Sequence, residues 1–405
     1  MRYDLIAKCA AAIVALGMSA SCATTQVVGT NVKRVVNGQP MDTSGLGQAV
    51  SADTKTMEAN LSVLRRKMLE AYAVLRTNVQ KRWGQTDAKM AERTVYVKYT
   101  DGYKSRVITD FDHGTLTVET VDDKDPHGSL RTAIVAALLT TNDPATVDLF
   151  SDKDVAPEST RKPYLYGLVH DNQGKSIGTH AQAEAFAQYL LAQKTQTRPV
   201  TGDHGTQTAL FVKISMVKNY EAKGAEHYRS AAEKYAAVYH VSPSLVLAIM
   251  RTESNFNPFA VSSAPAYGLM QLVPTSAGRA ALKRTQGVDD TPTAEYLFDS
   301  EHNIELGTAY LSVLNDTEFH GVGNQESRDY CVIAAYNTGP HNVTKTFAAN
   351  KTEALNDINQ MDPPTVFERL RTNLPYPETR EYVLKVTGYR KQFVGAPSAP
   401  TTAMQ

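Results

Sequence analysis

The sequence predicts two successive domains, an α+β domain followed by an all-α domain. With 405 residues, of which 42% are hydrophobic and 21% charged, the chain is long and apolar enough for two cores. Between 94 and 217, runs rich in β-branched and aromatic residues alternate with helical periods, which is typical of an α+β domain. After Tyr220 the apolar residues follow helical periods only, which predicts an all-α domain.

Residues 1–21 are predicted to be a secretory signal. A basic start precedes an apolar run over 9–18 that is too short to span a membrane. Residues 19–22, Ser-Ala-Ser-Cys, resemble the lipobox of bacterial lipoproteins, although the first serine replaces the usual aliphatic residue. The resemblance implies acylation of Cys22. Because Ala23 stands where an aspartate would retain the protein at the inner membrane, it also implies a lipid anchor in the outer membrane. Plain cleavage with a free cysteine is the alternative.

The α+β domain is predicted over 54–218, after a polar tether over 22–53 that has no clear periodicity. Apolar residues spaced by three and four from Met57 to Val79 indicate an amphipathic helix that ends near Trp83. Strands are predicted over 94–99 and 106–121, with hairpin turns at 101–102 and 112–114, and over 164–169 and 208–217. Helices are predicted over 130–139 and 181–193. No acid, base and nucleophile gather here, so the domain is expected to position or bind.

The all-α domain is predicted over 219–394, and the Pro- and Ser-rich tail over 395–405 is predicted to be disordered. Helices are predicted over 227–242, 243–253, 274–282, 303–314, 328–336, 364–370 and 378–392. Every chemical motif described below lies in this domain. We therefore expect it to be active without the α+β domain.

Charge and cysteine content exclude several classes of function. Lys plus Arg and Asp plus Glu both number 42, so no strong field attracts nucleic acid or an anionic surface. The three cysteines, Cys9, Cys22 and Cys331, do not have the spacing of metal ligands, and there is no glycine-rich phosphate loop. We expect no metal, no nucleotide cofactor and no nucleic-acid partner.

The stretch from Ser242 to Gln271 begins as a helix and ends as a binding surface. Ser242 is predicted to cap the helix, with Pro243 at its first position. Glu253 extends the apolar face of this helix, and the Asn- and Pro-rich residues 255–258 end it. The pattern therefore predicts a partly buried carboxylate at the C-terminal end of a helix. A solvated glutamate at a frayed helix end is the alternative.

Three motifs, in order, are similar to those of the lytic transglycosylases related to goose-type lysozyme. They are E-S-N-F-N-P-x-A-V-S from Glu253, G-L-M-Q over 268–271 and A-Y-N-T-G-P over 335–340. Three ordered motifs rarely coincide by chance. Upstream, residues 95–120, D-L-F-S-D and K-P-Y-L-Y-G resemble the N-terminal domain of membrane-bound members of this family. The resemblance covers most of the mature chain and implies a lysozyme-like fold for the second domain.

The resemblance implies cleavage of the MurNAc–GlcNAc β-1,4 bond of peptidoglycan with Glu253 as acid and base. Most glycosidases use two carboxylates, but only Glu253 is a clear candidate here. Its pKa must be raised by apolar neighbours to keep it protonated near neutral pH, and Met250, Met270 and Tyr336 are candidates for that role. Without a second carboxylate, the muramyl C6 hydroxyl would attack C1 and leave a 1,6-anhydromuramyl end.

Six further residues match positions that hold the substrate or the acid in this family. They are Ser262, Met270, Gln271, Tyr336, Asn337 and Tyr382. Short polar groups on a loop suit contacts to a sugar, although loop capping by Ser262 and a surface amide at Gln271 are the alternatives. Tyr336 has core packing as its alternative. Tyr382, in E-T-R-E-Y over 378–382, is expected to orient the acid, unless it is only an aromatic of an amphipathic helix.

Four residues that invite a chemical role are interpreted differently. Glu301 and Glu305 are taken as capping or solvated residues at a helix start, although either could be a second acid. Cys331, isolated in an apolar helix, is expected to be buried and inert. His341 follows the A-Y-N-T-G-P motif where relatives have a small residue, and its role is left open.

Two rival functions stand beside the transglycosylase. The first is a hydrolytic muramidase on the same fold, in which water is the nucleophile; the missing partner carboxylate argues against it. The second is a non-enzymatic glycan-binding module, and the glutamate at Glu253 argues against that reading.

Overall fold

The computed structural model describes residues 66, 70–142, 151–153, 162–203, 205–262 and 266–394. Its contacts form two units, Met1–Ala73 and Val74–Gln405, and all that follows concerns the second. The predicted signal, Cys22, the tether over 22–53 and the tail over 395–405 lie outside the described residues. The first part of the predicted Met57 helix also lies outside them.

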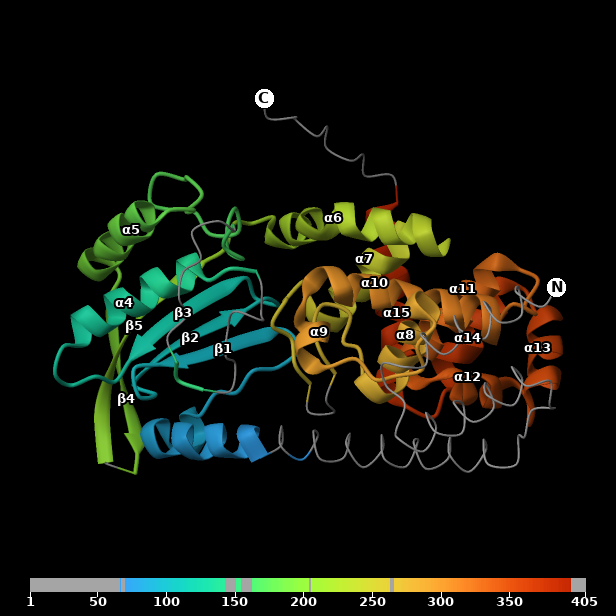
Figure 1. Cartoon of the computed structure of the whole chain (residues 1–405), viewed down its shortest axis with the longest axis horizontal. Coiled ribbons are helices and arrows are strands. Elements are labelled where there is room, and N and C mark those ends of the chain that lie inside the picture. The colour runs from blue at the N-terminus through green and yellow to red at the C-terminus, as the bar shows by residue number, and fades with distance from the viewer. Residues whose placement is uncertain are drawn as a thin grey trace, which may run out of the picture. The chain divides into compact units, whose positions relative to one another are not determined.

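The α+β domain is built on a five-stranded antiparallel sheet with the order β1-β2-β3-β5-β4 (Figure 1). The strands are β1 (Val95–Thr100), β2 (Ser105–Asp110), β3 (Thr115–Thr120), β4 (Gln196–Gly202) and β5 (Gly205–Ser215). Val97 pairs with Ile108, and Val118 pairs with Val212, so β-branched side chains lie opposite one another across the sheet. The hairpins predicted at 101–102 and 112–114 are confirmed.

Helices cover both faces of this sheet. Helix α4 (Pro126–Leu139) packs on β2 and β3, and α5 (His180–Gln193) packs on α4. Residues 74–87 form a helix on the other face. Trp83 of this helix is buried in a cluster with Val97 and Tyr99 of β1. Because successive strand residues point to opposite faces, Tyr96 faces the other way. The side chain of Tyr96 then contacts the helical domain through Phe259.

The sequence prediction failed at two strands. The predicted strand over 164–169 is a series of turns with isolated bridges: Tyr164 packs against Tyr96 and Phe259, whereas Tyr166 is exposed, so the segment forms no ladder. Conversely, β4 was not predicted, because its residues are mostly polar and include Pro199. Proline is tolerated there because β4 is the edge of the sheet.

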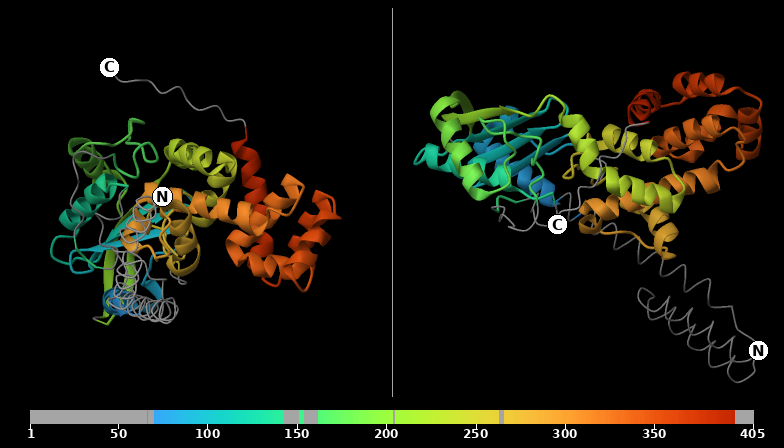
Figure 2. Two further views of the ribbon diagram at one scale, coloured as in Figure 1. Left: turned by 45° about the vertical axis from the view of Figure 1, so that its right-hand side comes forward. Right: turned by 90° about the horizontal axis from the view of Figure 1, so that it is seen from above.

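The second domain is all helical in its described part, so the predicted order of an α+β domain and an all-α domain is confirmed (Figure 2). It begins with α6 (Tyr220–Tyr239) and α7 (Pro243–Ser254). The later α-helices are α8 (Arg279–Gln286), α9 (Ala294–Phe298), α10 (Ser300–Val313), α11 (Gln325–Thr338), α12 (Pro340–Phe347), α13 (Lys351–Asn359), α14 (Pro363–Asn373) and α15 (Pro377–Phe393). Helix α7 packs against α6 and α15.

Some local predictions in this domain were wrong. Ser242 stands at the N-cap of α7 but makes no capping hydrogen bond, because its hydroxyl pairs with Ser244 Oγ at 2.8 Å. The helix predicted over 274–282 starts as the π-turn Pro274–Gly278 before α8. Helices α9, α12 and α13 were not predicted.

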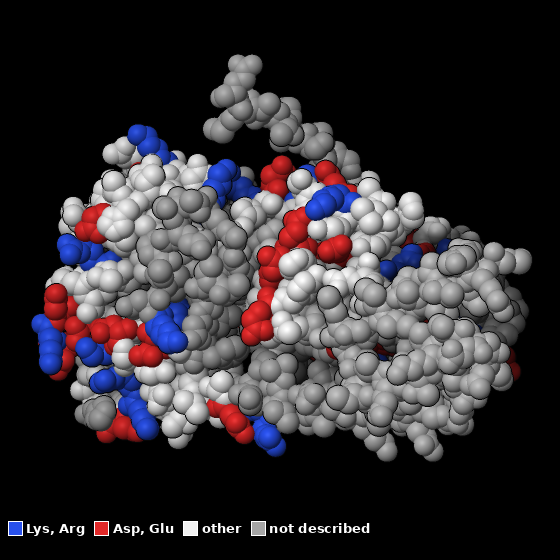
Figure 3. Space-filling view, viewed as in Figure 1, with Lys and Arg blue, Asp and Glu red and all other residues white. Residues whose placement is uncertain are grey.

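Acidic and basic side chains lie interspersed over the α+β domain on the face shown in Figure 3. Several form ion pairs within this domain, such as Lys104 with Asp122 at 3.2 Å and Arg131 with Glu184 at 3.5 Å. The Arg131–Glu184 pair is partly exposed, and exposed pairs contribute little to stability. Across the described residues, none of the helices combines the length and apolar character that crossing a bilayer requires.

Candidate active site

Glu253 lies in the last turn of α7 and is buried, with only 6% of its surface exposed. Ile249 and Met250, in the turn before it, belong to the domain core and have no exposed surface. Burial of the carboxyl group is the main cause that raises its pKa from 4.5 to about 7. A side chain in this state can donate a proton near neutral pH and take one back.

The two oxygens of Glu253 have different neighbours. The hydroxyl of Tyr382, on α15, donates a hydrogen bond of 2.7 Å to Oε1. Oε2 lies 3.8 Å from Nη1 of Arg93, which belongs to the α+β domain. The other guanidinium nitrogen of Arg93, Nη2, lies 3.5 Å from Glu378 Oε1 at the start of α15. Tyr382 and Arg93 both favour the ionised carboxylate, and Glu378 disfavours it.

The chain turns sharply after Glu253. Asn255 and Phe256 have φ values of 46° and 64°, a left-handed conformation that is strained for a residue as bulky as phenylalanine. Ser254 Oγ donates to Leu269 O at 2.8 Å, which ties the end of α7 to the G-L-M-Q segment. Asn303 Oδ1 accepts from Met270 N at 2.8 Å and fixes that segment on α10. Backbone strain is therefore held by contacts from several elements.

Ser262 and Gln271 both hold the loop between them. Ser262 Oγ accepts from Ala266 N at 3.3 Å. Gln271 is 8% exposed, so the surface-amide alternative is wrong. Its Nε2 donates to Ala260 O at 3.1 Å and to Gly268 O at 2.9 Å, while its buried Oε1 has no hydrogen-bond partner in the described part of the chain.

The A-Y-N-T-G-P motif ends α11 beside these segments. The hydroxyl of Tyr336 donates to Met270 O at 2.8 Å. Asn337 Oδ1 accepts from Thr379 Oγ1, on α15, at 2.7 Å. The structure thus brings Met270, Tyr336 and Tyr382 together around one end of α7, and Asn337 fixes α11 to the helix that carries Tyr382.

Sequence reasoning missed the contacts between this site and the α+β domain. Asn255 Nδ2 donates to Phe111 O at 2.7 Å, and Asn257 Nδ2 donates to Arg93 O at 3.1 Å. Phe259 is fully buried and stacks on Tyr96, with ring centroids 4.3 Å apart. Residues 255–258 were predicted only to end a helix. Their side-chain amides also link the two domains, and no sequence motif identified Arg93.

The other chemically suggestive residues lie elsewhere or are inert. Glu301 Oε1 accepts from Lys234 Nζ at 2.6 Å, and Glu305 Oε1 accepts from Tyr239 Oη at 3.2 Å, so both carboxylates face α6. Cys331 is fully buried, and burial raises the pKa of its thiol, as expected for an inert cysteine. His341 is exposed in α12. Among the described residues, no group of three or more His, Cys, Asp or Glu could hold a metal.

Both domains match models of known families. Residues 61–227 match the "Membrane-bound lytic murein transglycosylase C, N-terminal domain", and residues 230–359 match the "Transglycosylase SLT domain". The second match confirms the predicted class of the helical domain, a lytic transglycosylase domain.

Whole-chain relatives extend these matches. The chain is 44% identical over 316 residues to membrane-bound lytic murein transglycosylase C of Klebsiella pneumoniae, which covers 78% of this chain and 86% of that protein. It is 43% identical over 317 residues to the protein of the same name from Yersinia pestis, covering 78% and 87%. The chain therefore belongs to the membrane-bound lytic murein transglycosylase C family.

Solved structures give a partial likeness. The chain is 28% identical to the 70-kDa soluble lytic transglycosylase of Escherichia coli, with a TM-score of 0.32, and the likeness covers 42% of this chain and 24% of that one. For the complex of the 70-kDa soluble lytic transglycosylase with bulgecin A, the identity is 27% and the TM-score 0.33, over 44% of this chain and 26% of that one. The chain thus spans about a quarter of those structures.

Proposed function

We propose that this protein cleaves the MurNAc–GlcNAc β-1,4 bond of peptidoglycan and forms 1,6-anhydromuramyl ends, with Glu253 as the single acid and base. Family membership makes it a murein lytic transglycosylase, a lyase that acts on peptidoglycan. The observation that carries the finer proposal is the buried Glu253, whose pKa is raised to about 7 and whose Oε1 accepts a hydrogen bond from Tyr382.

The proposed reaction balances without water. Protonated Glu253 donates its proton to the glycosidic oxygen as the bond from that oxygen to muramyl C1 breaks. The muramyl C6 hydroxyl then attacks C1, and its proton passes to the carboxylate of Glu253. The new C1–O6 bond closes the anhydro ring, and Glu253 ends as it began. An attacking group within the substrate needs no second carboxylate to hold it.

The residues around Glu253 suit the sugar contacts that the family motifs imply. We assign Met270 and Tyr336 to the apolar surroundings of the acid, and the polar groups of Ser262, Gln271 and Asn337 to hydrogen bonds with the glycan. Gln271 Oε1 is buried without a partner among the described residues, and its Nε2 already holds the loop, so the glycan contact assigned to Gln271 rests on the family motif. Tyr382 is assigned to orientation of the acid.

Attachment to the outer membrane through acylated Cys22 is also part of the proposal. The lipobox-like segment over 19–22 supports it, and the relatives in Klebsiella pneumoniae and Yersinia pestis are named membrane-bound. An anchored enzyme would meet peptidoglycan on the periplasmic side. We also propose a division into domains near residue 218, which lies close to the junction of the two family matches.

A hydrolytic muramidase is the rival that one observation favours. Glu378 is a second carboxylate near Glu253, close enough for its charge to raise the pKa of Glu253. However, its side chain is 70% exposed and pairs with Arg93, whereas a hydrolase holds its base in place to activate a water. A glycan-binding module without activity is the remaining rival, but such a module would have no use for the raised pKa of Glu253.

The masses of the products decide between these functions. Peptidoglycan sacculi digested by the full-length protein should release anhydromuropeptides, each one water lighter than the product of a hydrolase. Products with reducing muramyl ends would replace the transglycosylase by the muramidase. Absence of any release, by a folded protein that binds sacculi, would favour the binding module.

A further inference from the structure

One arginine of the α+β domain lies at the candidate active site. Arg93 precedes β1, and its guanidinium lies between Glu253 and Glu378, with Nη atoms 3.8 and 3.5 Å from their carboxylate oxygens. Its side chain is 43% exposed, while that of Glu253 is 7% exposed, so the cation is partly solvated and the carboxylate is not. At 3.8 Å it acts on Glu253 through its charge and not through a hydrogen bond.

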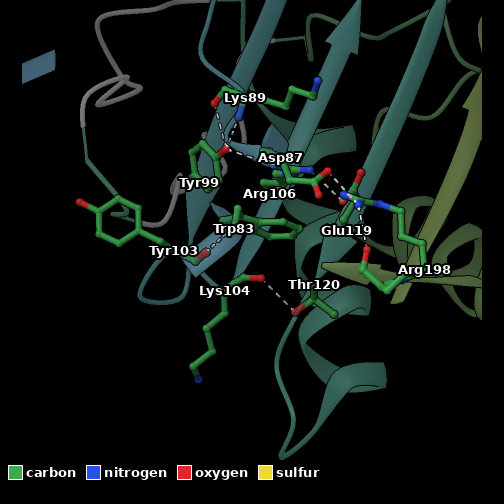
Figure 4. A network of polar contacts seen from close by, with 11 residues as sticks. Trp83, Asp87, Lys89, Tyr99, Tyr103, Lys104, Arg106, Glu119, Thr120 and Arg198 are labelled. Atoms are coloured by element: carbon green, nitrogen blue, oxygen red, sulfur yellow. Dashed lines mark hydrogen bonds and ion pairs between the residues drawn. The ribbon is translucent and has the colours of Figure 1, made fainter. Parts of the chain in front are cut away.

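A partly buried polar network holds the chain just before Arg93 (Figure 4). Arg106 is 1% exposed, and its Nη1 donates to Asp87 O at 2.6 Å. Arg198 Nη1 donates to Asp87 Oδ1 at 2.9 Å, and the hydroxyl of Tyr99 donates to Lys89 O at 2.9 Å. Both arginines also pair with Glu119: the Nη2 atoms of Arg106 and Arg198 lie 3.1 and 2.8 Å from its Oε2. Segment 87–89 is therefore fixed on the sheet.

The chain on the other side of the arginine is fixed as well. Glu92 N donates to Val95 O at 2.8 Å where the chain enters β1, and Asn257 Nδ2 bonds to Arg93 O at 3.1 Å. The backbone of Arg93 is thus tied both to the sheet and to the motif that carries the acid. Although Arg93 lies in a segment outside the helices and strands, these hydrogen bonds fix its backbone against β1 and against the helical domain.

We propose that Arg93 is a positioning residue of the active site, whose charge stabilises the carboxylate of Glu253 between proton donation and proton recovery. The α+β domain would then contribute to the chemistry itself as well as to the placing of the substrate. This inference rests on the proposed role of Glu253. It goes beyond that role, because the sequence motifs lie in the helical domain and the arginine does not.

The groups that face Glu253 set the expected sign. Tyr382 and Arg93 lower its pKa, Glu378 raises it, and burial outweighs them. Tyr336 of α11 also faces Glu253: burial raises the pKa of this tyrosine, and the nearby charge of Glu253 raises it further. The carboxylates of α6 and α10 are engaged elsewhere: Glu221 with Arg251, Glu301 with Lys234 and Glu305 with Tyr239. Removal of the Arg93 charge should therefore raise the pKa of Glu253, and removal of the Glu378 charge should lower it.

The test compares pH profiles of the full-length protein and three variants, Arg93→Gln, Arg93→Lys and Glu378→Gln. Initial release of soluble products from sacculi should fall at high pH as Glu253 loses its proton. In Arg93→Gln this basic limb should move up by about one pH unit, and the maximal rate should fall by up to about tenfold. Arg93→Lys, which keeps the charge, should lie close to the wild type. Glu378→Gln should move the limb down.

The opposite shifts separate an electrostatic role from a structural one. If Arg93 only supports packing between the domains, Arg93→Gln loses rate and its basic limb stays where the wild type has it; that result overturns the inference. If Arg93→Gln does not fold, Glu378→Gln decides, because its exposed side chain can be changed at little cost. An unmoved limb in Glu378→Gln overturns the inference as well. An active Glu253→Gln would instead overturn the proposed function.

Discussion

The hydroxyl of Tyr382 lies 2.7 Å from Oε1 of Glu253, although the two residues are 129 positions apart in the chain. Both groups are buried, and α15 packs along α7 to bring them together. A hydroxyl in this position fixes the rotamer of the carboxyl group and favours its ionised form. A hydrogen bond to a charged group contributes about 1.5–3 kcal/mol.

Tyr382→Phe should lower activity by about ten- to a hundredfold, because that energy acts on the ionised state of Glu253 during turnover. The basic limb of the pH profile should also move up. Tyr330→Phe is the matched control, because it removes a hydroxyl that bonds to the exposed Glu326 at 2.6 Å. Equal activity of Tyr382→Phe and Tyr330→Phe would show that the hydrogen bond does not orient the acid.

Stability should depend on pH through Glu253. The folded pKa of about 7 exceeds the ordinary value of 4.5, so this group's contribution is fully present below about pH 4.5 and is lost as pH rises through about 7. The loss corresponds to roughly 3 kcal/mol at about 1.4 kcal/mol per pKa unit. Urea unfolding of the wild type and Glu253→Gln across pH 4–8 should show the variant gaining relative stability as pH rises. A constant difference would contradict the raised pKa.

Gly307 allows α10 to approach the G-L-M-Q segment. A Cβ at this position would overlap the sulfur of Met270. Gly307→Ala should therefore destabilise the fold by about 1–3 kcal/mol and lower activity, because overpacking displaces Met270. Gly388→Ala in α15 is the control. A Cβ added at this position would have no atom within 4 Å, so the change should stabilise the fold by about 0.5–1 kcal/mol. Similar effects of both changes in thermal unfolding would refute the contact.

Cys22→Ala should release the protein from membranes, because the lipobox-like segment then has no thiol to acylate. Fractionation of cells that express the variant should recover it in the soluble periplasmic fraction, while the wild type sediments with the outer membrane. Undiminished recovery with the membranes would contradict lipid anchoring at this residue.

Periodicity predicted most of the fold. The spacing of apolar residues found α6, α7, α10, α11 and α15, because one face of each packs on a common core. The prediction of a strand over 164–169 was wrong because its apolar and aromatic residues are typical of a strand, whereas the segment forms turns from which Tyr164 packs against Phe259. Strand β4 was not predicted, because an edge strand buries few side chains and its sequence therefore shows little alternation of apolar and polar residues.

The sequence predicted those residues of the candidate site that belong to the family motifs. Glu253, Tyr336 and Tyr382 were nominated from sequence, and the structure brings them together. Arg93 was not, because a single arginine before a strand has no signature, and only folding brings it to Glu253 from another domain. The expectation that the helical domain acts alone left this arginine out. We expect a helical domain without Arg93 to have an altered pH profile.

Turnover by Glu253→Gln is the most direct test of the central claim. The amide keeps the shape of the side chain and can still accept from Tyr382, but it has no proton to transfer. We predict that soluble products from sacculi fall by at least a hundred- to ten-thousandfold, while binding to sacculi and the folded state persist, because general acid–base groups contribute about that much. Activity within about tenfold of the wild type would place the acid elsewhere and contradict the account.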